Sequence, residues 1–529
     1  MVSVELDAGL IIMCIIVPFI LLATNFIGIV HFIHPDDAAG AKFPKVVVLI
    51  GMVFAECAVL LLPLDVGNRG GLVGCGYWNN ECGGLDMDIV WQIVYVAIAG
   101  LVVIVLPYTI FYYEADERDA KQKERIWWTA LKYLLITVVV SVTALVILYA
   151  LLRQTYIPVK YMTVGTNWRH TWFPVDDVPN LNRACGGGCT TTDHVLKMDV
   201  TFVIFLAGLL AFLGWFLFVI YASIGFIALP MDFFNAFIHR RKLLSHSAVV
   251  AYQKALQGRA EQLIAMSDAL KEEWADYNSV RHSPVDRRKQ RKIHEVQLNK
   301  LRVLVDTLEG EAEDLRMSSP AEFKNNNILV PWMKLLAGII TTILTLAWLT
   351  HIVIYMLLDE TPFINDYLIW FDGWFPLFGT LTVGVFAIYL LLAVIKGNFK
   401  FGSRFFLIKI HPMVPHKTFV NSMIFNLMLV LLCVLPVVQF ASNAFRDYAR
   451  LTSVDVIFGS TIKHMEGFRY FFENDIFLYS FLGLTFLALV YFVWSPSEKK
   501  RLQKETAAHR DALASSRDAA LKQRQRQRK

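Results

Sequence analysis

The fold is decided by the stretch VVVLIGMVFAECAVLLLPLD, residues 46–65, in which Glu56 is the only charged residue before Asp65. The hydrocarbon core of a bilayer is about 30 Å thick, so a spanning helix needs roughly 20 apolar residues. The run is continuously apolar and does not alternate as the strands of a membrane barrel do, which favours a helix. We therefore predict a membrane-spanning helix over residues 44–63.

The rest of the chain repeats this pattern. Of its 529 residues, 56% are hydrophobic and only 18% are charged, whereas soluble domains carry about a quarter charged residues. The charge is concentrated between long apolar runs, which predicts an all-α polytopic membrane bundle. The expected spans, about nine by the length rule, cover residues 8–33, 44–63, 88–113, 126–152, 199–229, 330–358, 374–396, 419–443 and 473–494.

Two segments need separate interpretation. The first apolar run has no basic residue before it and is long enough to span, so we interpret it as a retained helix and not as a cleaved signal peptide. Residues 362–377 contain Asn365, Asp366 and Asp372 among aromatic residues. This second segment is either re-entrant or lies at the membrane interface.

The basic residues predict the orientation, because loops rich in Lys and Arg stay in the cytosol. They concentrate in the loops 34–43, 114–125, 230–329 and 397–418 and in the C-terminal tail. An N-terminus outside the cytosol and a cytosolic C-terminus follow. The predicted organisation is spans one to five in 1–239, a cytosolic insert in 240–329, spans six to nine in 330–495 and a basic tail in 496–529.

Four cysteines lie in the predicted non-cytosolic loops, namely Cys75, Cys82, Cys185 and Cys189. Disulfides persist in oxidising compartments, so we expect these four to be disulfide-bonded. Four cysteines allow three pairings, and the sequence does not choose between them. The alternative is that they are free thiols or metal ligands.

The insert has the pattern of two coiled-coil helices. Leu256, Leu263 and Leu270 recur every seven residues, and an alternating three–four spacing follows from Leu298. Pro284 interrupts the two patterns, which predicts an antiparallel helical hairpin in the cytosol. A basic cluster after the bend is either a solvated tip or a site for an acidic partner or anionic lipid; it comprises Arg287, Arg288, Lys289, Arg291 and Lys292.

No sequence motif of catalysis is present, and we predict a protein that is not an enzyme and has no metal site or cofactor. Glu56 is the main intramembrane candidate, because an unpaired carboxylate in lipid is costly. It is either a proton or ion site or a neutral acid that hydrogen-bonds a neighbouring helix. His351 and Asn25 are weaker candidates, expected to make polar packing contacts.

Two prolines are expected to end helices. Pro63 should stop or kink the second span, after which Asp65 either satisfies the freed backbone or faces a ligand. Pro230 follows the fifth span and should turn the chain out of the bilayer into the insert.

Four short motifs give a resemblance when taken in order. They are LLPLDV at 61–66, FYYE at 111–114 with Tyr112, Tyr113 and Glu114, TALKY at 129–133, and ALP at 228–230. With these motifs the chain resembles the limb-region (LIMR) family of nine-span membrane proteins. The motifs cover the chain to about residue 330, and the remainder resembles the family by span count.

The resemblance implies a receptor or escort rather than an enzyme. It implies a role in lysosomal cobalamin export beside an ABC transporter, or in ligand uptake, at an endosomal, lysosomal or plasma membrane. The expected partners are membrane lipid, an ABC transporter or other membrane protein, and a second copy of the chain, without nucleic acid. The alternative is a stand-alone transporter or channel that uses Glu56.

Overall fold

The computed structural model divides into two compact units, one of residues 1–231 and 338–490 and the other of residues 232–337 and 491–529. The predicted ranges 1–239 and 330–495 therefore contribute mainly to a single unit. The residues that the structure describes are 8–34, 37, 40–72, 86–118, 123–164, 170–174, 189–240, 243–279, 284–319, 329–358, 360–375, 378–401, 404–405, 408–409, 411, 413–416, 418–450 and 452–494.

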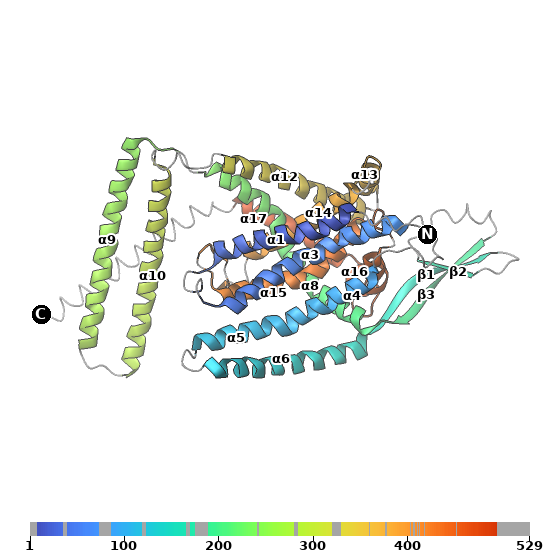
Figure 1. Cartoon of the computed structure of the whole chain (residues 1–529), viewed down its shortest axis with the longest axis horizontal. Coiled ribbons are helices and arrows are strands. Elements are labelled where there is room, and N and C mark those ends of the chain that lie inside the picture. Colours follow the sequence, from blue (N-terminus) through green and yellow to red (C-terminus); the bar gives the residue numbers. More distant parts are fainter. Residues whose placement is uncertain are drawn as a thin grey trace. The chain divides into compact units, whose positions relative to one another are not determined.

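Within these ranges, nine helices are long and apolar enough to cross a membrane, and the chain is an integral membrane protein (Figure 1). Two of these helices have π-helical continuations. The nine are α1 (Ala8–Phe32), α3 (Lys42–Leu72), α4 (Met87–Gly100) continued by η1 (Leu101–Val105) and α5 (Leu106–Arg118), α6 (Lys123–Leu152), α8 (Phe202–Ile238), α12 (Leu329–His351) continued by η3 (Ile352–Leu357), α14 (Phe378–Phe401), α15 (Val420–Ala444) and α17 (Ile476–Trp494).

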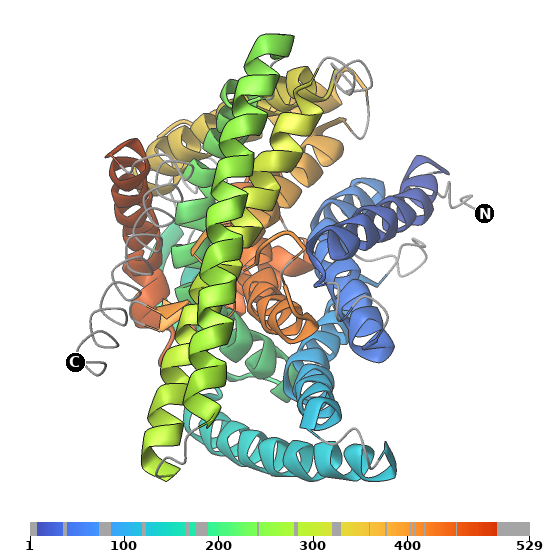
Figure 2. The same cartoon turned by 90° about the vertical axis from the view of Figure 1, so that its left-hand side faces the viewer.

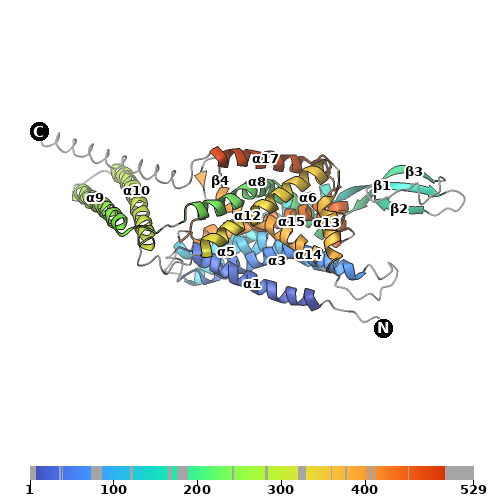
Figure 3. The same cartoon turned by 90° about the horizontal axis from the view of Figure 1, so that it is seen from above.

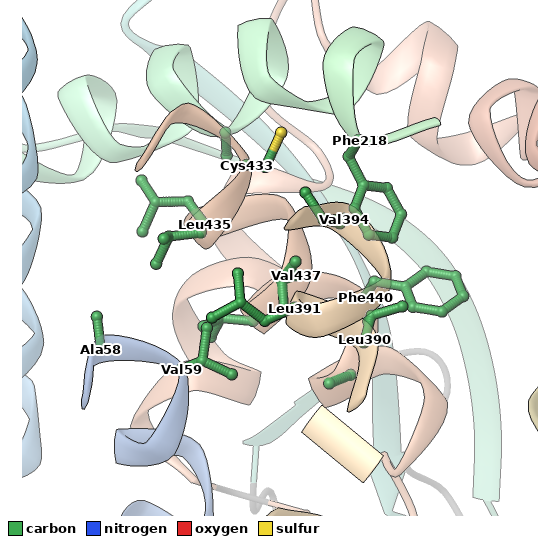
Figure 4. Packing of buried hydrophobic residues seen from close by; sticks show 14 of the residues in the cluster. Ala58, Val59, Phe218, Leu390, Leu391, Val394, Cys433, Leu435, Val437 and Phe440 are labelled. Carbon is green, nitrogen blue, oxygen red and sulfur yellow. The ribbon is translucent and has the colours of Figure 1, made fainter. Parts of the chain in front are cut away.

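Helix α15 forms the centre of the first unit. Figure 2 shows it in orange, surrounded by the other helices of that unit. Its side chains Leu435 and Val437 meet Val59 of α3 and Leu391 of α14 in the buried core (Figure 4). A mostly apolar helix such as α15 is stable in the middle of a bundle, because mainly apolar neighbours surround it.

Two glycines let α8 and α14 approach each other closely. A Cβ atom added at Gly225 would lie 1.7 Å from the carbonyl oxygen of Ala393, and one at Gly397 would lie 1.8 Å from that of Tyr221. Such distances are impossible for any side chain. Small residues allow this close backbone packing, which is a main source of helix association in membranes.

The predicted break at Pro230 is wrong, and of the two outcomes predicted for Pro63, a stop is wrong, whereas a kink stays a prediction. Helix α3 continues to Leu72 and α8 continues to Ile238. A proline in a helix leaves the carbonyl four residues earlier without its usual donor. For Pro230 that carbonyl belongs to Phe226, and the hydroxyl of Thr345 on α12 donates to it over 3.2 Å. A neighbouring span thus allows α8 to continue.

The all-α prediction is also wrong for the loop 153–198, which forms an antiparallel sheet of order β2-β1-β3 (Figure 3). Its strands are β1 (Gln154–Val164), β2 (His170–Pro174) and β3 (Cys189–Asp199). β1 pairs with β3 from Gln154↔Asp199 to Val164↔Cys189. The segment 155–164 is rich in β-branched and aromatic residues, which favour strands.

Short elements complete the first unit. Helix α13 (Phe363–Asp372) occupies most of the segment 362–377, for which the sequence left a re-entrant and an interfacial interpretation. At ten residues it is too short to span a membrane. Asp372 accepts hydrogen bonds from the backbone N–H of Gly379, at the start of α14, and from the Tyr448 hydroxyl. The remaining elements are β4 (Arg404–Phe405), β5 (Ile408–Lys409), η4 (Asp455–Ile462) and α16 (Arg469–Glu473).

The second unit contains α9 (His246–Ser279) and α10 (Pro284–Met317), which lie against each other in opposite directions. Leu270 and Leu304 are buried between them. Nearer the start of α9, Arg259 forms a 2.7 Å ion pair with Glu311. At the base, the N–H of Leu244 donates to the carbonyl of Ser318 over 3.1 Å, so the two ends of the insert meet.

Candidate functional site

The base of the sheet is fixed to the segment that follows α15. The N–H of Tyr156 donates to His464 O over 3.0 Å, and the N–H of Glu466 donates to Gln154 O over 2.8 Å. The Thr155 hydroxyl also donates to Thr461 O over 2.9 Å. Backbone hydrogen bonds therefore join two loops that are about 300 residues apart in the chain. We call residues 154–164, 170–174, 189–199 and 452–473 the sheet platform.

Two cations contact one ring at this junction. Arg469 lies 5.0 Å and Lys197 lies 5.4 Å from the centroid of the Tyr156 ring. These distances are within the range of a cation–π interaction. The Arg469 contact ties α16 to β1, and the Lys197 contact lies between two neighbouring strands of the sheet.

Strand β3 exposes apolar side chains. Val195 is 63% exposed, Leu196 39% and Met198 44%. Neighbouring residues of a strand point to opposite faces, so the sheet has apolar groups on both faces at this edge. Exposed apolar groups on a membrane protein's extramembrane part are a feature of contact surfaces.

Asp65 connects the sheet platform to the bundle. It is buried at the end of α3, where its Oδ2 accepts hydrogen bonds from Trp91 Nε1 at 3.0 Å and Val454 N at 3.1 Å. Its Oδ1 accepts a longer bond of 3.4 Å from Ser453 N. The helical turns of 453–462 begin at these N–H groups, which otherwise lack helical partners. Asp65 therefore caps a segment nearly 400 residues later in the chain.

Glu56 contacts a residue that the sequence also indicated. Asn25 Nδ2 donates to Glu56 Oε2 over 2.6 Å, and Glu56 as a residue is 7% exposed. Asn25 Nδ2 also lies 2.9 Å from Leu21 O on its own helix. The pair joins α1 to α3, which is the geometry of a helix–helix hydrogen bond in lipid.

His351 belongs to a different polar contact. Its Nε2 lies 2.8 Å from Ala444 O, at the last residue of α15, and Asn365 Nδ2 donates to the same carbonyl over 3.3 Å. His351 ends α12 where the π-helical η3 begins. The histidine thus satisfies a carbonyl at a helix end, and Glu56 has no part in this contact.

The FYYE motif lies beside the first loop, at the end of the bundle away from the sheet. The Tyr113 hydroxyl donates to Asp37 Oδ2 over 3.0 Å, and Val420 N donates to the same oxygen over 2.9 Å. Tyr112 makes an edge contact with the ring of Phe43. Asp37 thereby joins α5 to the start of α15, and the sequence offered no periodic signal for this pairing.

His411 lies in the same region, within the electrostatic influence of Glu114. Burial lowers the pKa of His411, and the charge of Glu114 partly opposes that shift. His411 Nδ1 lies 3.2 Å from the Ser422 hydroxyl on α15. The last residue of FYYE is therefore an electrostatic neighbour of the loop before α15.

Several residues singled out in the sequence lie outside the part of the chain that the structure describes. Cys75, Cys82 and Cys185 lie outside the described residues, and Cys189 begins β3 with a side chain that is also outside them. The basic cluster 287–292 is on α10, but its side chains are likewise not described. Among the described residues, no group of three or more His, Cys, Asp or Glu could hold a metal ion.

The fold and these sites define a multi-pass helical membrane protein with a sheet at one end. The family model of the LMBR1-like membrane proteins matches residues 10–302 and 289–493. A LIMR family protein of Arabidopsis thaliana is 33% identical over 510 residues, which cover 93% of this chain and 97% of the relative. The chain belongs to the LIMR family.

Relatives from other lineages match over similar lengths. A LIMR family protein of Oryza sativa subsp. japonica is 31% identical and is covered to 96%, with 92% of this chain aligned. One from Dictyostelium discoideum is 26% identical, with 93% of this chain and 98% of the relative covered. No solved structure matches the chain.

Proposed function

We propose that this protein is a receptor or escort that docks partner molecules on both sides of the membrane and has no catalytic activity of its own. In this proposal the sheet platform faces away from the cytosol, and the α9–α10 hairpin and the C-terminus are cytosolic. The distribution of Lys and Arg over the loops supports this orientation.

The observation that carries the proposal is the close packing at the centre of the bundle. The backbones of α8 and α14 touch at Gly225 and Gly397, and a Cβ at Gly214 would lie 2.0 Å from Leu432 O of α15. The core that these contacts enclose is mainly apolar, and buried polar side chains such as Gln439 and Asn398 make hydrogen bonds within the protein. A solute path needs polar groups or water along its length, so this packing favours an escort over a transporter.

The contact made by Glu56 also favours an escort over a transporter. Its carboxyl group is engaged by Asn25 between two neighbouring spans. A transport site would need to exchange that contact for an ion or proton during each cycle. Transport through Glu56 is the second candidate, and its only support is the position of a carboxyl group in the middle of a span.

The proposed docking surfaces are the sheet platform and the hairpin. The platform is rigidly based, through Asp65 and the hydrogen bonds of Tyr156, and exposes apolar groups on β3. The hairpin presents two long polar helices with a narrow apolar contact between them, as in cytosolic coiled coils that bind other proteins.

The ligand and the membrane that we propose are those that the family resemblance implies. They are cobalamin leaving a lysosome with the help of an ABC transporter, or a ligand taken up at the plasma membrane. The matched plant and Dictyostelium relatives carry only a family name, so they favour neither cobalamin export nor ligand uptake.

The test uses the full chain in native membranes. Residues 245–317 are replaced by a short Gly-Ser linker, which the meeting of Leu244 with Ser318 makes geometrically easy. A second variant, Leu270→Asp, places a charge in the contact between α9 and α10. Gly258→Ala is the matched control, because a Cβ there meets no atom within 4 Å.

Affinity purification followed by mass spectrometry identifies the associated proteins. The deletion and Leu270→Asp should lose partners that the parent and Gly258→Ala retain, at equal abundance in the membrane. Retention of every partner by the deletion variant would contradict a docking role for the hairpin.

A further inference from the structure

Strand β3 lies at one edge of the β2-β1-β3 sheet. In the described part of the chain it pairs on one side with β1, and no strand pairs with its other side. Residues 192–199 are all exposed. A long edge strand is a template for another strand, and proteins block such edges with prolines, bulges or charged side chains. β3 has no proline but carries the charged residues Asp193 and Lys197.

The contacts of β1 determine which residues of β3 present their backbone at the open edge. Tyr156 donates its N–H to His464 and therefore directs it away from β3. Tyr156 is paired with Lys197, so this is a pair without mutual hydrogen bonds and Lys197 directs its N–H and C=O outward. Because the direction of the backbone N–H and C=O groups alternates along a strand, Val195 and Asp193 also direct theirs outward.

The outward residues are self-complementary. In an antiparallel pairing of β3 with a second β3, centred on Val195, residue 193 of each copy lies opposite residue 197 of the other. Asp193 then faces Lys197 in two symmetric places, and the two Val195 side chains meet between them. Opposite charges at directly opposed positions stabilise a strand pair, whereas like charges destabilise it.

We propose that β3 is a homophilic contact surface, which pairs antiparallel with β3 of a second copy of this chain through a two-fold axis at Val195. The three outward residues of each copy form hydrogen-bonded pairs, which join the two sheets into one of six strands. The interface is isologous, as in most symmetric dimers.

The direction of the strands places the second copy. β1 follows α6 after one residue, and the sheet runs outward from the end of the bundle (Figures 1 and 3). Antiparallel pairing reverses the strand direction, so it also reverses the outward direction of the partner's bundle. Two copies that pair in this way meet from facing membranes.

The test is a charge swap in the purified full chain. Lys197→Asp sets two carboxylates against each other at both symmetric positions and should raise the dimer dissociation constant on the order of tenfold or more. Asp193→Lys should do the same with opposite charge. The double variant Asp193→Lys with Lys197→Asp restores both opposite-charge pairs and should restore the dimer.

Thr192→Asp is the matched control, because this register places Thr192 opposite Met198 and adds no charge pair. Native mass spectrometry in detergent reports the dimer, and light scattering of reconstituted vesicles reports clustering of facing membranes. A monomeric parent, a dimer unaffected by either single change, or a double variant that stays monomeric would each overturn the proposal. Dimers that form in detergent but never cluster vesicles would overturn the facing-membrane geometry.

Discussion

Replacing Asp65 by alanine should release the sheet platform from the bundle while leaving the spans inserted. The carboxyl group is the shared acceptor for Trp91 Nε1, Val454 N and Ser453 N. Alanine removes the acceptor and leaves buried donors that no water reaches. The segment 453–462 then begins without its cap, and the hydrogen bonds of β1 to residues 461–466 lose their rigid base.

The magnitude follows from the number and length of these bonds. A buried donor left without an acceptor costs about 1–3 kcal/mol. The bonds from Trp91 Nε1 (3.0 Å) and Val454 N (3.1 Å) should each contribute this full cost, whereas the bond from Ser453 N (3.4 Å) is too long to contribute much. Asp65→Ala should therefore lower the free energy of unfolding by about 4 kcal/mol. Asp65→Asn keeps one acceptor and should cost about half as much.

Equilibrium unfolding in mixed micelles measures the change, and limited proteolysis locates it. Cleavage between residues 445 and 472 should become faster in Asp65→Ala than in the parent. Trp91→Phe is the control, because it deletes one donor and leaves the cap on Val454 in place. The reasoning is refuted if Asp65→Ala unfolds at the parent's detergent concentration, or if the new cleavage sites fall in the spans.

Two further predictions concern the other polar contacts. Glu56→Gln keeps an acceptor for Asn25 and should leave the free energy of unfolding nearly unchanged. Glu56→Leu should lower it by about 1–2 kcal/mol in the same unfolding assay. Complete loss of function in Glu56→Gln at normal abundance would instead indicate a proton or ion site. Burial holds the pKa of His411 below its ordinary value of 6.5, so its contribution to stability is present above about pH 6.5 and is lost as the pH falls through the lower folded-state pKa. Thermal unfolding should show this acid sensitivity in the parent but not in His411→Gln, and equal sensitivity in both would assign it to another group.

The sequence alone was sufficient to predict the membrane-spanning segments. Each apolar run is long enough to cross the bilayer, and lipid leaves a continuous apolar segment few structures other than a helix. The predicted ranges therefore agree with the nine helices to within a few residues at most ends. The largest disagreements are at the ends of α3 and α8, which run on past Pro63 and Pro230. At Pro230 a donor comes from Thr345, more than a hundred residues later.

The sheet shows a different limit of sequence reasoning. Residues 155–164 have strand-forming composition, but a strand forms only with partners, and β3 begins 25 residues after β1 ends. The length and the charge of this loop carry no information about strand pairing. The alternation of β-branched and aromatic residues in TYIPVKYMTV was the available signal.

Taken alone, the sequence determined which segments lie in the membrane, because burial in lipid depends on the composition of each segment by itself. Only the tertiary structure decided what the isolated polar residues do. Glu56 meets Asn25, Asp65 caps residues 453–454, and Asp37 joins Tyr113 to α15. A hydrogen bond depends on the position of both partners, and these partners are separated by as many as 389 residues along the chain.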